Sequence, residues 1–349
     1  MINRYLSDKI KLLSLFSMFL VLYIHSGFHN YPHEILGMKF NNVLQSCISG
    51  KIGRCAVPIF YMISGFLFFQ NIENGISSIF IKMKKRIRTL FIPYIIGCLF
   101  FPLFFIILIF IPGCNKFMNG GNDILSLFEQ PFYEIISSIF YKKPDGTSPL
   151  AFQLWFLRDL IIIVLISPVI YLLRKHINKY VLILCTLCLS CFEGINAYFP
   201  FLSLFWFLLG DCLFNKISNS IFLYVYMIIS SIEVYFSITF PTYINTLVTI
   251  IGVFGILSIY NIIVPQNYIL KHNKYLLLAC NTTFFVYLFH EPTLNLIRKL
   301  LVVILGQSSV GFAFSYLLSP WVFTVAAIFI SLLMKRYIPK AYSVLAGGR

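Results

Sequence analysis

Long apolar runs follow one another over almost the whole chain. A helix needs about 20 mainly apolar residues to cross a bilayer core, where every backbone polar group must find a partner inside the protein. Hydrophobic residues make up 59% of the 349 residues and charged residues only 11%, which excludes an ordinary soluble domain. We therefore predict an all-α, polytopic membrane helical bundle that forms a single integral-membrane domain over residues 1–349.

The apolar runs predict about ten transmembrane helices. The second, fifth and sixth of them are short, so we expect these three either to extend by a few residues or to enter only half of the membrane. The predicted spans are Ile10–Phe28, Val57–Gln70, Thr89–Ile111, Leu154–Leu173, Tyr180–Phe192, Pro200–Phe214, Ile221–Phe240, Tyr243–Val264, Leu276–Ile297 and Phe314–Met334.

If the N-terminus is cytoplasmic, 18 of the 27 Lys and Arg residues fall at the two termini and in the alternate connections on the same side. Cytoplasmic segments of membrane proteins carry the excess of such residues, so the pattern predicts that both termini are cytoplasmic. The formal net charge of +15 is then a topology signal, and we expect no nucleic-acid partner. The longest connection, Pro112 to Gln153, is predicted to lie outside the membrane, where a loop of this length is more often functional than a simple connector.

The first apolar run, Ile10 to Asn30, carries a histidine near its far end. On a helix Ser14 lies on almost the same face as His25, and Lys11 lies roughly 40° away, so one stripe is polar. An ionisable side chain at membrane depth is costly unless it faces a bundle interior or a cavity, which makes His25 a candidate functional residue. The alternative is a histidine at the membrane interface that shares a hydrogen bond with Ser26 or a lipid headgroup.

The second polar stretch is RCAVPIFYMISGFL, from Arg54 to Leu67. Arg54 stands at the outer entrance of the second span, and Ser64 and Gly65 lie inside it. Pro58 and Gly65 are expected to loosen the helix and free backbone groups, which is typical of a helix that lines a cavity. The alternative is a proline-kinked span with an arginine that reaches to the membrane surface.

The third stretch is QLWFLRDL, from Gln153 to Leu160, with Ser167 and Pro168 after it. Neighbouring helical residues point about 100° apart, so we expect that Arg158 and Asp159 cannot form an ideal pair with each other and find partners on neighbouring helices. Both a structural tether and a site for an anionic or hydroxyl-bearing group are compatible with this pattern.

The fourth stretch is NTTFFVYLFHEP, from Asn281 to Pro292. The predicted direction of its span carries His290 toward the outer half that also holds His25. Two histidines at similar depth strengthen the case for a site. His290 and Glu291 lack the second histidine of the zinc-protease pattern.

Two patterns resemble metal sites, but we expect no metal. His25, His29 and His33 recur every four residues with Glu34 beside them, yet Pro32 disfavours helix at the preceding residue. Cys185, Cys188 and Cys191 lie in an apolar run, where packing as small hydrophobic side chains is the preferred interpretation.

A basic cluster, KMKKRIR from Lys82 to Arg88, lies on the predicted cytoplasmic side. Its residues Lys84, Lys85 and Arg86 are candidates for holding the phosphates of a cytosolic cofactor or anionic lipid headgroups. An ordinary positive-inside anchor is the alternative. No P-loop or dinucleotide fingerprint occurs, so ATP-driven or nicotinamide chemistry has no support.

Together these stretches resemble the acyltransferase-3 family of bacterial integral-membrane O-acyltransferases. The resemblance follows the family's order over essentially the whole chain. It rests on His25, on VPIFYMISGFLFF after Arg54, on QLWFLRDL with the later SP, on FWFLLG from Phe205 to Gly210, on FFVYLFHEP, and on Pro339 with Gly347, Gly348 and Arg349.

This resemblance implies a multi-pass protein of the bacterial inner membrane that works among membrane lipids. It would transfer an acyl group, most often acetyl, from cytosolic acyl-CoA to a hydroxyl of a cell-surface or lipid-linked saccharide. One position departs from the family pattern: eleven residues before the histidine a basic residue is usual, and here Ser14 stands. Lys11, one turn earlier, has a stem long enough to reach the same volume.

His25 is the candidate general base of that reaction, since an imidazole can accept the proton of an attacking hydroxyl. Arg54, Ser64, Arg158 and His290 are candidates for orienting the acceptor or stabilising an oxyanion. Lys11, Ser14, Lys84, Lys85 and Arg86 are candidates for binding acyl-CoA. A transporter or exporter of saccharides on the same fold is the alternative function, because its binding cavity would also need buried charged residues.

Overall fold

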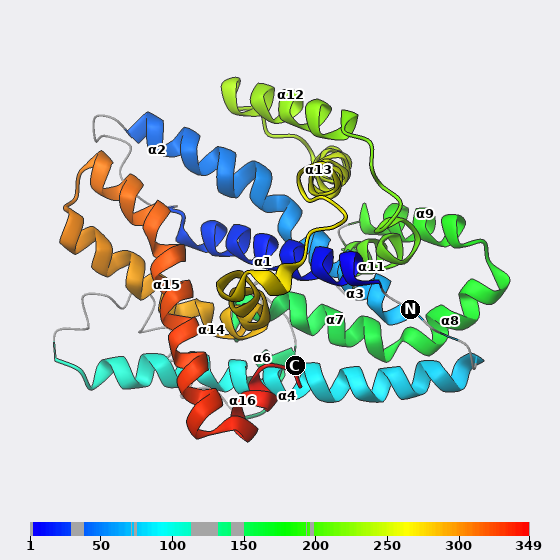
Figure 1. The fold of residues 1–349 in the computed structure, drawn as a ribbon, viewed down its shortest axis with the longest axis horizontal. Helices are drawn as coiled ribbons and strands as arrows, with labels where there is room; N and C mark the ends of the chain where they lie inside the picture. Colours follow the sequence, from blue (N-terminus) through cyan, green and yellow to red (C-terminus); the bar gives the residue numbers. More distant parts are fainter. Residues whose placement is uncertain are drawn as a thin grey trace. The chain divides into compact units, whose positions relative to one another are not determined.

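The computed structural model describes residues 3–28, 38–70, 72, 75–112, 132–140, 150–192, 194–195 and 199–348. Every regular element in these ranges is helical, as predicted (Figure 1). The helices form two compact units. The first unit comprises Met1–Met83 and Leu165–Thr283, and the second comprises Lys84–Val164 and Phe284–Arg349. Both are built from segments far apart in the sequence, and a single domain stays a prediction.

The first unit begins with α1 (Arg4–Ser26) and continues through a nearly unbroken helical segment. That segment consists of α2 (Met38–Gln45), the π-helix η1 (Ser46–Ile52), the 3₁₀ turn η2 (Gly53–Cys55) and α3 (Ala56–Phe69). The unit is completed by α8 (Ser167–His176), α9 (Lys179–Ser190), α11 (Phe201–Leu213), α12 (Ile221–Tyr235), α13 (Thr242–Ile263) and η6 (Leu270–His272).

The second unit contains the remaining helices, and two long helices run through both units. Its own elements are α6 (Phe132–Phe140), η5 (Phe152–Leu154), α7 (Trp155–Leu165), α15 (Ser309–Tyr337) and α16 (Pro339–Leu345). The shared helices are α4 (Gly75–Ile109) and α14 (Lys274–Leu305).

Five helices of the described residues are long and apolar enough to cross a membrane, or six if the bent pair α7 and α8, with 57° between its arms, is one span. The predicted second span is part of a longer helix, Phe40–Phe69, and the predicted fourth span corresponds to the bent pair. Three further apolar helices, α9, α11 and α12, are shorter. The count of ten spans and the cytoplasmic termini therefore stay predictions.

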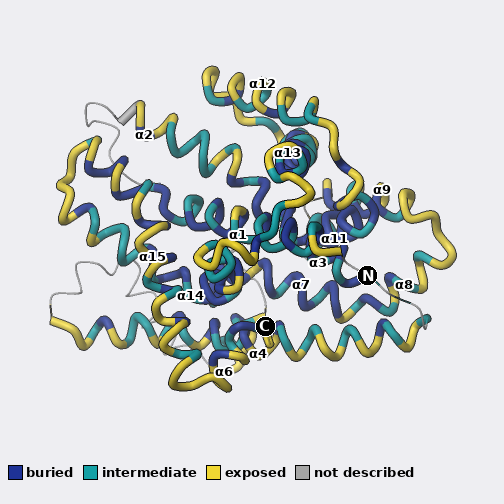
Figure 2. The backbone as a smooth tube through the Cα atoms, in the orientation of Figure 1, coloured by how far each residue is buried: buried dark blue, intermediate teal, exposed yellow. Residues whose placement is uncertain are grey.

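Several long helices carry exposed residues along their length (Figure 2), and many of these residues are large and apolar. On α15, Trp321, Val325 and Phe329 are more than half exposed and recur every four residues, so they form a stripe along one face. Directly after the last residue of α4, Phe110 is 81% exposed. Apolar surfaces of this extent are expected where lipid replaces water as the surrounding medium.

The core of the first unit forms where α3 and α11 cross at very short range. A Cβ atom at Gly65 would lie 1.8 Å from the Phe207 carbonyl oxygen, and one at Gly210 would lie 2.1 Å from that of Met62. The two backbones therefore approach closely only because both positions lack a side chain. Gly65 was expected to loosen its helix, and this interpretation is wrong, because α3 stays helical there and uses Gly65 for packing.

Candidate active site

His25 lies half-buried in the last turn of α1, within the first unit. Two hydrogen bonds connect the end of this helix to the segment that precedes α3. The Ser49 hydroxyl donates to the Tyr23 carbonyl oxygen at 2.8 Å, and the Phe28 amide donates to Gln45 Oε1 at 2.8 Å. The first bond satisfies a carbonyl oxygen that a helix end leaves open, and the second ties the residue two positions beyond α1 to α2. His25 is thus carried by a helix end that is fixed against η1.

The segment around Arg54 packs against the same end of α1. A Cβ atom at Gly53 would lie 2.9 Å from Ile24 Cγ1, so this glycine allows η2 to touch the residue that precedes His25. Arg54 follows directly. The π-helical geometry of η1 shifts the register of the chain just before this contact, and π-helical turns are common at functional sites. The structure therefore brings the segments of His25 and Arg54 together.

Arg54 is held by a carboxylate on α12 that the sequence interpretation missed. Its Nη2 donates to Glu233 Oε2 at 2.8 Å and its Nη1 to Glu233 Oε1 at 3.2 Å, so the two groups meet as two parallel forks. Nε donates to the Tyr226 hydroxyl at 3.2 Å, and Nη1 also donates to Asn245 Oδ1 at 3.3 Å. Four of the five guanidinium N–H groups are engaged in this way, and within the described part of the chain one N–H on Nη2 is left.

Glu233 is shared between two cations. Lys51 Nζ lies 3.2 Å from Glu233 Oε1, and the Glu233 side chain is only 1% exposed. The Tyr226 hydroxyl donates to the Lys51 carbonyl oxygen at 2.6 Å and so joins η1 to α12. The sequence signal for Glu233 was its place as the single acidic residue in the apolar run Ile221–Phe240. A lone carboxylate at membrane depth is costly unless a cation lies beside it.

The polar stripe predicted on α1 has a different character in the structure. The Ser14 hydroxyl donates to the Ile10 carbonyl oxygen of its own helix at 2.7 Å, and Lys11 is half-buried. The buried lysine is Lys9, whose Nζ donates to Asn261 Oδ1 at 3.0 Å. It also lies over the rings of Phe214 and Tyr260 at 5.5 and 5.7 Å. Lys9 was not among the residues that the sequence pattern singled out.

Ser64 lies half-buried on α3, one residue before the contact of Gly65 with α11. Its place in the first unit is fixed by that crossing. The structure assigns Ser64 to the same helix that Arg54 precedes.

Arg158 and Asp159 contact each other in the second unit, against expectation. Arg158 donates to Asp159 Oδ1 from both Nε and Nη2, at 3.0 and 2.7 Å. The long arginine stem bends back to its neighbour, so the 100° between adjacent residues does not prevent the pair. Both donors converge on one carboxylate oxygen, which is a less favourable geometry than two parallel bonds.

His290 is fully buried in the second unit, beside an interruption of α14. Its Nδ1 lies 2.6 Å from the Tyr287 carbonyl oxygen, which assigns the ring proton to Nδ1 in the neutral form. At Glu291 the backbone leaves helical geometry, with φ −108° and ψ 138°. Gln153 Nε2 donates to the Glu291 carbonyl oxygen at 3.1 Å, and the Tyr287 hydroxyl donates to the Gln153 carbonyl oxygen at 3.1 Å. These two bonds therefore connect the stretch QLWFLRDL with the stretch FFVYLFHEP.

The predicted cytoplasmic basic cluster contacts the C-terminal end of α3 through its first residue. Lys82 Nζ donates to the carbonyl oxygens of Phe68, at 3.1 Å, and of Gln70. Lys84 and Lys85 are exposed on α4, and Arg86 is half-buried.

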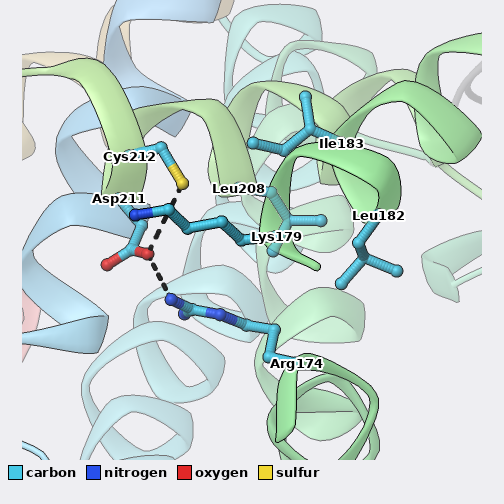
Figure 3. Close-up of a pocket in the computed structure, with 7 residues that line it drawn as sticks. All are labelled: Arg174, Lys179, Leu182, Ile183, Leu208, Asp211 and Cys212. Atoms are coloured by element: carbon cyan, nitrogen blue, oxygen red, sulfur yellow. Dashed lines mark hydrogen bonds and ion pairs between the residues drawn. The ribbon is translucent and has the colours of Figure 1, made fainter. Parts of the chain in front are cut away.

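A second ion pair lies at the same end of α3. Arg174 Nη2 donates to Asp211 Oδ2 at 2.5 Å, and its guanidinium lies 4.1 Å from the centroid of the Phe69 ring. Lys179 extends along the same hollow, whose other wall is formed by Leu182, Ile183 and Leu208 (Figure 3). Lys82 and Arg174 thus both contact the C-terminal end of α3.

The described residues contain no group of three metal-ligating side chains. His29, His33 and Glu34 lie outside the described residues, as does most of the long connection from Pro112 to Gln153. Cys185, Cys188 and Cys191 are exposed on α9 rather than packed inside, so the packing interpretation is wrong for them. A weakly polar thiol is compatible with such an apolar outer face.

Comparison with known proteins gives one match, to a family. The model of the Acyl_transf_3 family, described as an acyltransferase domain, matches residues 8–336. Searches of curated proteins and of solved structures found no match. The matched range includes His25, the Arg54 segment, and the two stretches that meet at Gln153. With several helices apolar enough to cross a membrane, this chain is a multi-pass membrane acyltransferase of the acyltransferase-3 family.

Proposed function

We propose that the protein is an O-acyltransferase of the bacterial inner membrane that uses acyl-CoA, most often acetyl-CoA, as its donor. The acceptor is a hydroxyl of a cell-surface or lipid-linked saccharide. The single observation that carries this proposal is the packing of the Arg54 segment on the end of α1 that bears His25. A proton acceptor and a fixed hydrogen-bond donor with positive charge are two groups that promote acyl transfer to a hydroxyl.

His25 acts as the general base in the proposed reaction. The saccharide oxygen attacks the thioester carbon as His25 takes its proton, and the tetrahedral intermediate then expels the CoA sulfur, which receives the proton back. The C-terminal end of a helix carries a partial negative charge, which favours the imidazolium that exists between these two steps. The position of His25 in the last turn of α1 supports this role.

Arg54 supplies positive charge for the oxyanion in this proposal. Its guanidinium is fixed by Glu233, so little reorganisation accompanies the build-up of charge, and one N–H on Nη2 remains to donate. Ser64, Arg158 and His290 are the further candidates for orienting the acceptor. For the donor phosphates the candidates are Lys11, Ser14, Lys84, Lys85 and Arg86, of which Lys84 and Lys85 are exposed.

The test measures transfer of radiolabelled acetyl groups from acetyl-CoA into envelope carbohydrate in membrane vesicles. We expect His25→Ala to lower this transfer by roughly 100-fold or more, since general base catalysis contributes about 10²–10⁴. His176→Ala is the matched control, because His176 is exposed at the end of α8 and has no role in the proposed site. Transfer by His25→Ala at the level of the His176→Ala control would overturn the proposed base.

A further inference from the structure

We propose that Glu233 is a positioning residue of the acyl transfer reaction, which acts by holding Arg54 in place. This inference rests on the proposed function, because it assumes that Arg54 stabilises the oxyanion. Glu233 lies 179 residues from Arg54 in the sequence, and the two side chains meet with both carboxylate oxygens opposite both terminal nitrogens. Such a paired geometry fixes the plane of a guanidinium as well as its position.

The burial pattern of α12, all of whose residues are described, supports a dedicated role for Glu233. This helix buries two positions, Tyr226 and Glu233, and both contact Arg54. Seven residues apart on a helix, they lie on one face, while apolar residues such as Tyr224, Met227 and Ile228 are exposed. The side of α12 that faces the protein is therefore organised around the arginine.

The remaining contacts of the cluster limit how Arg54 can turn. Asn245 on α13 accepts from Nη1 while its own Nδ2 donates to the Phe240 carbonyl oxygen at 2.6 Å. Tyr226 accepts from Nε, donates to the Lys51 carbonyl oxygen, and lies with its ring 5.4 Å from the Arg54 guanidinium carbon. Each neighbour of Arg54 is thus itself fixed by a second bond.

Charge makes Glu233 the decisive member of this set. Lys51 and Arg54 carry like charges beside the same carboxylate, and their side chains are only 15% and 16% exposed. Without the negative charge these two cations would repel each other in a poorly solvated place. Tyr226 and Asn245 are neutral and cannot compensate, so loss of the Glu233 charge is expected to displace the Arg54 fork.

The first experiment compares Glu233→Gln with Asp211→Asn in the full-length protein in membrane vesicles. Both variants neutralise a carboxylate that pairs with an arginine in the first unit, but Asp211 lies near the other end of α3 and outside the proposed site. We expect Glu233→Gln to lower kcat for acetyl transfer by roughly 10- to 100-fold with little change in the KM for acetyl-CoA, since an oxyanion donor is worth about 10²–10³. Asp211→Asn should leave kcat within about twofold of wild type.

A double-mutant cycle separates positioning from general stabilisation. If Glu233 acts through Arg54, adding Glu233→Gln to Arg54→Ala will not lower kcat any further. Glu233→Asp, which keeps the charge, should regain part of the lost kcat and also provides a variant if Glu233→Gln is not recovered in the membrane. Additive losses in the cycle, or equal kcat for Glu233→Gln and wild type, would overturn the positioning role.

Failure of this inference can be distinguished from failure of the proposed function. A large loss in Arg54→Ala with none in Glu233→Gln would remove Glu233 and keep Arg54. Wild-type kcat in Arg54→Ala would remove the oxyanion role of Arg54, and with it the inference, whereas His25→Ala tests the reaction itself.

Discussion

The two ends of α3 are held by ion pairs that differ in geometry and exposure. At the N-terminal end Arg54 meets both oxygens of Glu233, whose side chain is 1% exposed and which also pairs with Lys51. At the C-terminal end Arg174 makes one bond to Asp211, and the two side chains are 22% and 14% exposed beside an open hollow. Fourteen helical residues place the two pairs about 20 Å apart.

This difference means that the two ion pairs depend to different degrees on the charge of their carboxylate. A buried carboxylate that loses its charge leaves its cations uncompensated, whereas an exposed pair is partly replaced by water or headgroups. The more buried pair, Arg54 with Glu233, lies next to the helix end that carries His25, and the less buried pair, Arg174 with Asp211, lies at the other end of α3. The contrast thus supports a precise polar site at one end of α3 and a solvated basic surface at the other.

The largest expected effect tests directly whether the two ion pairs differ in their contribution to stability. We expect Glu233→Gln to lower the free energy of unfolding by about 3 kcal/mol, because it leaves Lys51 and Arg54 without their shared counter-charge. Asp211→Asn should cost about 1 kcal/mol, since its partner Arg174 keeps its contact with Phe69 and is nearer to solvent. Denaturation of both variants in detergent, followed by tryptophan fluorescence, gives the two values. Equal losses would contradict the distinction between the two pairs.

The next effect tests the close crossing of α3 and α11, which lies between the two ion pairs. We expect Gly65→Ala to destabilise the protein by about 2 kcal/mol, because its Cβ would meet the Phe207 backbone, which no side-chain rotation can relieve. Gly194→Ala is the control, since a Cβ there meets nothing within 4 Å. The same detergent denaturation applies. If Gly65→Ala and Gly194→Ala were equally stable, the crossing of α3 and α11 would not be as close as the structure has it.

Sequence reasoning reached the helical class and the polar stretches because both depend on local patterns. Apolar runs predict membrane helices, and residues such as His25 and Arg54 stand out against them. It did not reach Glu233 as the partner of Arg54, because the pair joins residues 179 positions apart and local sequence patterns do not show which distant residues meet in space.

Local geometry misled the sequence interpretation in two places. Helical angles predict partners for Arg158 and Asp159 on neighbouring helices and no ideal pair between them, but the long, flexible arginine side chain reaches its neighbour with two donors on one oxygen. We expected Gly65 to loosen its helix, although a residue without a side chain equally allows two helices to pack closely. Which of these two uses applies depends on the facing helix, and that information is not local.

The smallest expected effect sharpens the comparison by removing only the second cation of the buried pair. We expect Lys51→Met to change the free energy of unfolding by about 0.5 kcal/mol, because Glu233 keeps its two bonds to Arg54 and methionine keeps most of the apolar stem. Lys274→Met, at an exposed position of the first unit, is the control for loss of one positive charge. A loss for Lys51→Met as large as that for Glu233→Gln would mean that Lys51, rather than the paired bonds of Arg54, holds the carboxylate. Glu233 would then be a shared counter-charge, and the N-terminal pair would differ from the Arg174–Asp211 pair in number of cations instead of geometry.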